Sequence, residues 1–165
     1  MMHEPSWTVE EMLAENPCKE YTHNRLADYW DGRERLTLSE ILELDIPDND
    51  KVWVCCRNKV GVLREKWLER VVARAAETAA RAAEADDVDV AKAAVRAADL
   101  AAAYAEEATN AAEAADDAEA ADDAYAAAYA AAEAADAVDA YATECTLQVQ
   151  NMRDVIKKTT CEGIS

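Results

Sequence analysis

The fold is decided by the segment AADDAEAADDAYAAAYAAAEAADA, residues 114–137, which is built almost entirely from methyl groups and carboxylates. It contains no Gly, Pro, Lys or Arg, and its only large side chains are Tyr125 and Tyr129. Alanine has the highest helix propensity, and the two residues that break helices are missing. Gly and Pro are also absent from the whole of residues 62–162, so the sequence predicts an all-α fold.

A single helix over residues 62–158 is excluded by the placement of its large side chains. It would be about 145 Å long at about 1.5 Å per residue. Tyr129 and Val138 are nine residues apart, so on one straight helix they would point to opposite sides. We expect breaks near residue 86, near residue 110 and within 117–123. These breaks would give three or four long helices packed antiparallel, capped by short N-terminal helices.

Residues 1–60 form the other compositional region and contain all three prolines of the chain. Capping boxes at Thr8 and Thr37 predict two short helices, and Gly32 is expected to end a helix over residues 22–31. The segment KVWVCC, residues 51–56, is compatible with a strand. We expect helix there because no partner strand is visible. Residues 1–60 and 61–165 are expected to form one continuous fold.

The last helix carries a continuous apolar seam. Its members recur at intervals of three and four residues, which places them on one side of a helix. Such a seam is typical of helix packing, and it could also support a homo-oligomer. The seam consists of Val138, Tyr141, Cys145, Val149, Met152 and Ile156.

The net charge of −18 is concentrated in residues 97–144, which hold thirteen carboxylates and no Lys or Arg. Ordinary exposed helix faces mix both signs, because like charges four residues apart destabilise a helix. The excess of negative charge argues against direct binding to nucleic acid or to an anionic membrane. The thirteen are Asp99, Glu106, Glu107, Glu113, Asp116, Asp117, Glu119, Asp122, Asp123, Glu133, Asp136, Asp139 and Glu144.

Imitation of a phosphate backbone is one reason to concentrate charge in this way. On a single helix the thirteen carboxylates would lie about 5.5 Å apart along the axis, against about 1.7 Å per charge in duplex DNA. Two antiparallel helices would bring the spacing to about 2.8 Å. Mimicry therefore requires the acidic helices to lie side by side. The alternatives are an ordinary solvated face and a cation site. The candidate partner-binding residues are Glu113, Asp116, Asp117, Asp122, Asp123, Tyr125 and Tyr129.

No motif in the sequence indicates catalysis, a metal site or a cofactor. The paired aspartates at 116–117 and 122–123 lack the alternating oxygens and central Gly of a calcium loop, and they suit helix N-caps better. Cys55 and Cys56 are adjacent, which suits buried thiols better than a disulfide. His3, His23 and Cys18 lack zinc-ligand spacing. We therefore expect a protein that is not an enzyme.

The expected location is the cytoplasm of a bacterial host. Polar residues interrupt any apolar run at the start of the sequence, so no signal peptide is expected. No window of about 20 apolar residues is free of charge, which argues against a membrane span. The five cysteines are an odd number, as expected for reduced thiols.

The segment LTLSEILELDIPDNDKVWVCCRNKV, residues 36–60, followed by Ala-rich sequence, resembles small phage and bacterial proteins of the immunity-protein type. Those proteins share an LTL-EIL-LDIP run before Ala-rich helices. The resemblance implies a phage or bacterial setting and a role in conflict between them, and it implies no catalytic residue.

Charge and resemblance together predict an acidic protein that occupies a basic nucleic-acid-binding groove of another protein. Its concrete form would be a phage anti-defence inhibitor of the anti-CRISPR or anti-restriction type that acts as a DNA mimic. One alternative is an immunity protein that neutralises a cognate basic toxin or nuclease. The other is a structural protein that oligomerises through the apolar seam.

Overall fold

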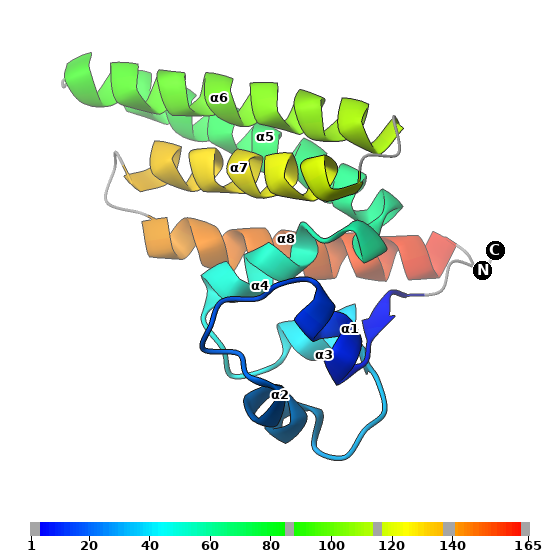
Figure 1. Cartoon of the computed structure of the whole chain (residues 1–165). Coiled ribbons are helices and arrows are strands. Elements are labelled where there is room, and N and C mark those ends of the chain that lie inside the picture. Colours follow the sequence, from blue (N-terminus) through cyan, green and yellow to red (C-terminus); the bar gives the residue numbers. More distant parts are fainter. Residues whose placement is uncertain (1–3, 85–87, 114–116, 137–140, 163–165) are drawn as a thin grey trace.

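The structure is a computed structural model that describes residues 4–84, 88–113, 117–136 and 141–162. Four long helices run up and down through these residues, each antiparallel to the one before it (Figure 1). They confirm the expected all-α fold and its antiparallel bundle. They are α5 (Val62–Ala83), α6 (Val88–Glu113), α7 (Asp117–Asp136) and α8 (Tyr141–Glu162).

One of the three expected breaks is confirmed and two are wrong. The chain leaves α5 after Ala83 and re-enters helix at Val88, as expected near residue 86. Residue 110 lies inside α6, where the hydroxyl of Thr109 donates to the carbonyl of Ala105 at 2.9 Å and is satisfied within the helix. Residues 117–123 lie inside α7. The Asp122–Asp123 pair therefore does not interrupt the helix, because the surrounding alanines favour helix. The boundary between α6 and α7 falls instead between Glu113 and Asp117.

The N-terminal part consists of short elements with well-defined ends. Thr8 and Thr37 both form complete capping boxes, with Glu11 and Glu40 as the reciprocal partners. α2 ends at Asp31, which adopts the left-handed conformation with φ 47°, and Gly32 follows with φ 74°, so the expected helix end is confirmed. The elements are β1 (Ser6–Trp7), α1 (Val9–Ala14), α2 (His23–Trp30), β2 (Leu36–Thr37), α3 (Leu38–Leu42), α4 (Asp48–Cys55) and the 3₁₀ turn η1 (Asn58–Val60).

In the N-terminal part, the sequence predicted the helix α4 but not the pairing of two short strands. The helical interpretation of KVWVCC is confirmed, because α4 ends only at Cys55. The antiparallel pairing of β1 with β2, which aligns Trp7 with Leu36, was not expected. Both strands are two residues long, too short for a period-two pattern to be visible in the sequence.

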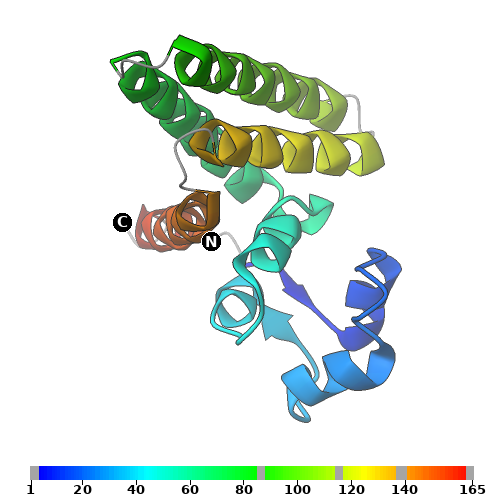
Figure 2. The ribbon, with the colours of Figure 1, turned by 90° about the vertical axis from the view of Figure 1, so that its left-hand side faces the viewer.

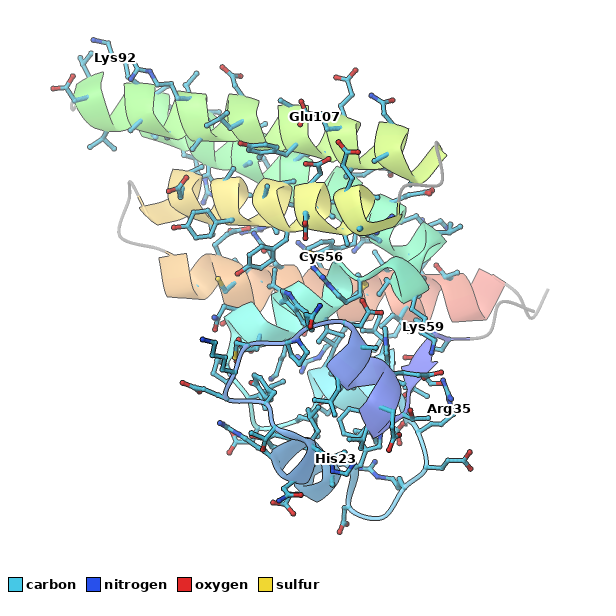
Figure 3. The ribbon with its side chains drawn as sticks, viewed as in Figure 1. His23, Arg35, Cys56, Lys59, Lys92 and Glu107 are labelled. Carbon is cyan, nitrogen blue, oxygen red and sulfur yellow. The ribbon has the colours of Figure 1, made fainter. Side chains whose placement is uncertain are left out.

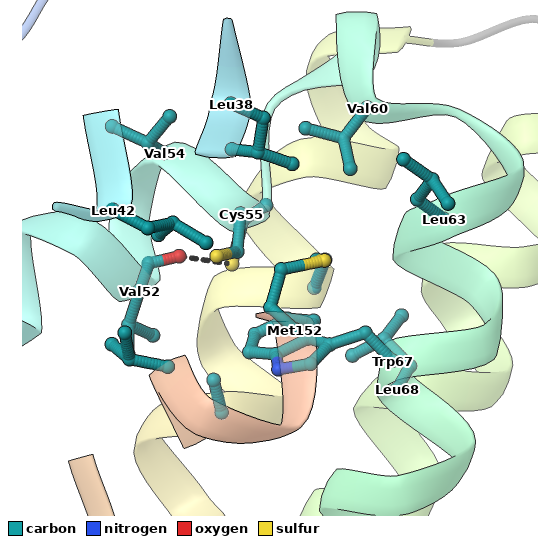
Figure 4. Close-up of a cluster of buried hydrophobic side chains, with 14 of the residues drawn as sticks. Leu38, Leu42, Val52, Val54, Cys55, Val60, Leu63, Trp67, Leu68 and Met152 are labelled. Atoms are coloured by element: carbon teal, nitrogen blue, oxygen red, sulfur yellow. Dashed lines mark hydrogen bonds between the residues drawn. The ribbon is translucent and has the colours of Figure 1, made fainter. Parts of the chain in front are cut away.

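The short helices lie beside α8 and do not cap an end of the bundle, which corrects the expected arrangement (Figures 1 and 2). A single hydrophobic cluster includes residues from both regions, with Leu38 and Cys55 on one side and Trp67 and Met152 on the other (Figure 4). A guanidinium N–H of Arg153 on α8 donates to the carbonyl of Leu42 at 2.7 Å.

Candidate functional site

The two acidic helices, α6 and α7, lie side by side and antiparallel (Figures 1 and 2). Their facing surfaces consist mainly of alanine, and Ala101 of α6 and Ala124 of α7 are both 0% exposed. Small side chains let the helix backbones approach closely, so the outer faces of both helices are also close together. The geometry required for a dense acidic surface is therefore present.

Seven of the thirteen carboxylates lie on the described parts of these two helices. Six are exposed and Asp123 is half-buried. On α7, Glu119, Asp122 and Glu133 fall within an arc of about 60° at about 100° per residue, so they form one outward stripe. We call the seven the acidic surface: Asp99, Glu106, Glu107, Glu119, Asp122, Asp123 and Glu133.

The acidic surface has a charge spacing close to that of one nucleic-acid strand. Its seven carboxylates share about 21 Å of the paired helices, the length from Glu119 to Glu133 at about 1.5 Å per residue, or about one per 3 Å. Successive phosphates of one DNA strand are about 3.4 Å apart along the axis, whereas the duplex carries one charge per about 1.7 Å. The surface therefore matches one strand of a duplex rather than both.

The acidic surface is largely uncompensated by cations. Within the described ranges, Asp99, Glu106, Glu107, Asp122, Asp123 and Glu133 form no ion pair. The nearest basic residue on the same helix, Arg96, lies one turn before Asp99, and Lys92 lies further towards the beginning of α6, far from Glu107 (Figure 3). Such a surface attracts cationic groups and repels anionic ones.

Glu144 belongs to the same acidic segment of the sequence but not to this surface. Its side chain is 4% exposed and forms a bidentate pair with Arg74 of α5, with N···O distances of 3.2 and 2.9 Å. These hydrogen bonds raise the pKa of Arg74. The carboxylate of Glu144 therefore joins α8 to α5 inside the bundle.

The predicted partner-binding residues divide into three groups. Asp122 and Tyr129, which is 48% exposed, lie on the outer side of α7, and Asp123 beside them is half-buried. Tyr125 is half-buried and packs against the hydrophobic cluster instead. Glu113 ends α6 and Asp117 begins α7, but their side chains, like the whole of Asp116, lie outside the described residues.

The apolar seam of α8 is used within the chain. Cys145, Val149, Met152 and Ile156 are all at most 7% exposed. Val138 and the side chain of Tyr141 lie outside the described residues. An oligomer formed through the four buried members would require α8 to leave the bundle, so the seam is not an available surface in this fold.

The two adjacent thiols of α4 and its C-cap are buried. Burial raises the pKa of Cys55 well above its usual range and that of Cys56 to about 12, so both stay protonated and weakly reactive. In the described ranges, no three His, Cys, Asp or Glu side chains cluster in a way that could hold a metal ion. No described helix is long and apolar enough to span a membrane.

A cavity of about 270 Å³ lies in the N-terminal part, between α1, α2, α4 and one side of α7. Its deeper wall is apolar and buried, and includes Met12, Leu26 and Ile41. Its remaining wall is aromatic and contains a single carboxylate, Asp50. The aromatic side chains are Tyr21, Tyr29, Trp30, Trp53 and Tyr125.

Asp50, the carboxylate of this cavity, is hydrogen-bonded to Tyr21, which also lines the cavity. The hydroxyl of Tyr21 donates to Oδ2 of Asp50 at 2.5 Å. Burial, and then this hydrogen bond, raise the pKa of Tyr21, so the phenol remains protonated and keeps donating. No sequence pattern indicates this site, because Tyr21, Asp50 and Tyr125 lie on three separate segments.

The chain was compared with known proteins at three levels. No protein-family model, no curated protein and no solved structure matches it.

Proposed function

We propose that this chain is a non-enzymatic acidic binding protein that occupies a basic nucleic-acid-binding surface of another protein. The observation that carries the proposal is the acidic surface itself, with seven carboxylates on two adjacent helices and no Lys or Arg in residues 97–144. A one-sign surface costs stability through self-repulsion. A role in binding a basic partner accounts for that cost, whereas a merely solvated face would be served better by mixed charges.

The mechanism is competition with nucleic acid. A surface with about one charge per 3 Å attracts lysine and arginine groups arranged to bind a phosphate strand, and it accelerates the encounter with them. Tyr129, exposed on the same side of α7, provides a rigid aromatic contact beside the carboxylates. A phage anti-defence inhibitor that blocks DNA access to a CRISPR or restriction complex is the concrete form we favour.

An immunity protein against a basic nuclease would use the same electrostatics and remains the second candidate. The acidic surface favours both equally, so the identity of the partner must separate them. A structural oligomer through the seam of α8 finds less support, because Val149 and Met152 are 1% and 0% exposed within the chain.

The proposal is tested by capture followed by competition. The immobilised chain is exposed to a bacterial lysate freed of nucleic acid, at near-physiological salt, and retained proteins are identified. Short duplex DNA is then added at increasing concentration. We expect a specific nucleic-acid-binding protein to be retained and then released by DNA.

A retained protein that DNA fails to release would contradict competition for a shared surface. Retention of no specific protein from lysates of phage-infected or toxin-producing hosts would also overturn the proposal. Release by 0.5 M salt without DNA should accompany the expected result, because exposed charge pairs are screened over about 5 Å or less at that ionic strength.

A further inference from the structure

We propose that the aromatic cavity of the N-terminal part binds a small organic cation, an ammonium group attached to an aromatic or compact apolar body. The ammonium would sit beside Asp50, and the apolar body would lie among the surrounding rings. This site is separate from the acidic surface, and the proposal does not depend on the proposed function.

The walls of the cavity provide the apolar part of the site. Five of its lining side chains are aromatic, and those of Trp30, Leu26 and Ile41 are at most 4% exposed. Tyr21 and Tyr29 are inclined to one another by 43°, with ring centroids 6.5 Å apart. Rings at such angles present both faces and edges to a ligand, and ring faces attract cations.

The charge of the cavity selects a cation. Asp50 is the only charged side chain in its lining, and within the described ranges it forms no ion pair. Its neighbour Lys51 is directed to Asp48, with an N···O distance of 3.3 Å. Oδ2 of Asp50 accepts the hydrogen bond from Tyr21, which leaves Oδ1 as an acceptor for a ligand. An anionic ligand would be repelled by the same carboxylate.

Two protein cations already contact the outer aromatic residues. The guanidinium of Arg25 lies 5.1 Å from the ring centroid of Tyr21, and that of Arg57 lies 4.3 Å from the ring of Trp53. Neither arginine lines the cavity. These contacts hold the rings in place and leave the interior of the cavity without a cation of its own.

The volume limits the size of the ligand. A cavity of about 270 Å³ corresponds to roughly nine water molecules at about 30 Å³ each. It is at the small end of ligand-binding pockets. The cation therefore has roughly nine to twelve non-hydrogen atoms, comparable to 2-phenylethylammonium.

The test compares three probes of nearly equal size on the full chain: 2-phenylethylammonium, neutral 2-phenylethanol and anionic phenylacetate. Binding is measured by calorimetry and by amide chemical-shift changes in NMR spectra. We expect saturable binding of the ammonium, at least tenfold weaker binding of the alcohol, and no binding of phenylacetate. Shifts should concentrate at residues 17–21 and 46–54.

The variant Asp50→Asn keeps an acceptor for Tyr21 and removes the charge, and it should weaken binding of the ammonium at least tenfold. The matched control is Asp45→Asn, an exposed carboxylate on the loop before α4 that does not line the cavity. It should bind the probe as the unmodified chain does. If Asp50→Asn fails to fold, the comparison of the three probes on the unmodified chain still decides.

Three results would overturn the proposal. They are the absence of saturable binding of 2-phenylethylammonium, equal affinity for the alcohol, and undiminished binding by folded Asp50→Asn. Shifts confined to α6 and α7 would likewise show that the cation binds the acidic surface and not the cavity.

Discussion

The N-terminal part and the α6–α7 pair achieve order by different means. In the N-terminal part, large side chains interlock, and the indole N–H of Trp30 donates to the carbonyl of Trp7 at 3.0 Å. In the α6–α7 pair, the buried side chains are alanines and the exposed ones are mostly carboxylates.

The difference shows which part of the molecule is optimised for stability. A buried alanine removes little apolar area from water, so the α6–α7 pair gains less per residue from burial than the N-terminal core. Its acidic surface opposes folding further through like-charge repulsion. The α6–α7 pair is therefore stabilised weakly and charged strongly, and the proposed binding function rests on this combination.

The largest loss of stability is expected for a substitution at the junction between the N-terminal part and the helical bundle. Trp67 is fully buried, and its indole N–H donates to the carbonyl of Gln148 at 2.9 Å. Trp67→Ala should lower the free energy of unfolding by about 3–5 kcal/mol, measured by urea denaturation. Val95→Ala, at a 42% exposed position of α6, is the control and should cost less than about 0.5 kcal/mol. A loss below about 1 kcal/mol for Trp67→Ala would contradict this description of the core.

In α7, where the buried side chains are closely packed alanines, a larger side chain is expected to destabilise the fold. Ala124 is fully buried, so Ala124→Leu should destabilise the chain by about 1–3 kcal/mol through overpacking. Ala102→Leu on the exposed side of α6 should change stability by no more than about 0.5 kcal/mol. Thermal and urea unfolding of the two variants give the comparison. A stabilising effect of Ala124→Leu would mean that the helices are not closely packed.

Neutralising Glu144 in its buried pair with Arg74 should cause an intermediate loss of stability. Glu144→Gln removes the charge and one acceptor while keeping the shape, and Arg74 is 26% exposed, so water compensates part of the loss. We expect a cost of about 1–2 kcal/mol. Glu69→Gln, an exposed carboxylate on α5, serves as the control. Equal stability of the two variants would place Glu144 with the surface carboxylates.

Sequence patterns predicted the helices better than the places where they end. The capping boxes at Thr8 and Thr37 could be predicted because side-chain caps are local interactions. The end of α6 could not, because alanine favours helix equally at every position and the turn depends on tertiary packing.

The sequence predicted some residues of the candidate sites and missed others. The charge of the acidic surface was visible in composition, and its gathering on two adjacent helices followed from the expected antiparallel bundle. The position of Tyr125 was not predictable, since its contact with the N-terminal part depends on how α4 packs against α7. The burial of Glu144 was missed because its partner, Arg74, lies 70 residues away in sequence.

The smallest effect concerns acid stability of the N-terminal part. Glu11 contacts Lys59 at 2.7 Å, accepts from the amide of Thr8 at 3.0 Å and contacts Arg35 at 2.6 Å. These contacts, Lys59 first, lower the pKa of Glu11 from 4.5 to about 2. The stabilisation is therefore complete above pH 4.5 and is lost as the pH falls towards 2.

Urea midpoints of the unmodified chain and of Glu11→Gln, measured between pH 2 and 7, test this dependence. The difference should be largest above pH 4.5, remain small because Glu11 is 41% exposed, and vanish near pH 2. A difference that grows on acidification would contradict the assignment.

The proposed function requires that the position of the carboxylates, and not the total charge, determines binding. Two variants with the same change in net charge test it. One neutralises Asp99, Glu107, Asp122 and Glu133 of the acidic surface. The other neutralises four exposed carboxylates elsewhere, namely Asp28, Glu34, Asp45 and Glu65. In both, Asp is replaced by Asn and Glu by Gln.

The decisive measurement is the Kd of each variant for the DNA-releasable partner obtained by capture, at constant ionic strength. We expect at least a tenfold increase in Kd for the first variant and less than a twofold increase for the second. Equal increases for both variants, or a larger increase for the second, would contradict the proposed function.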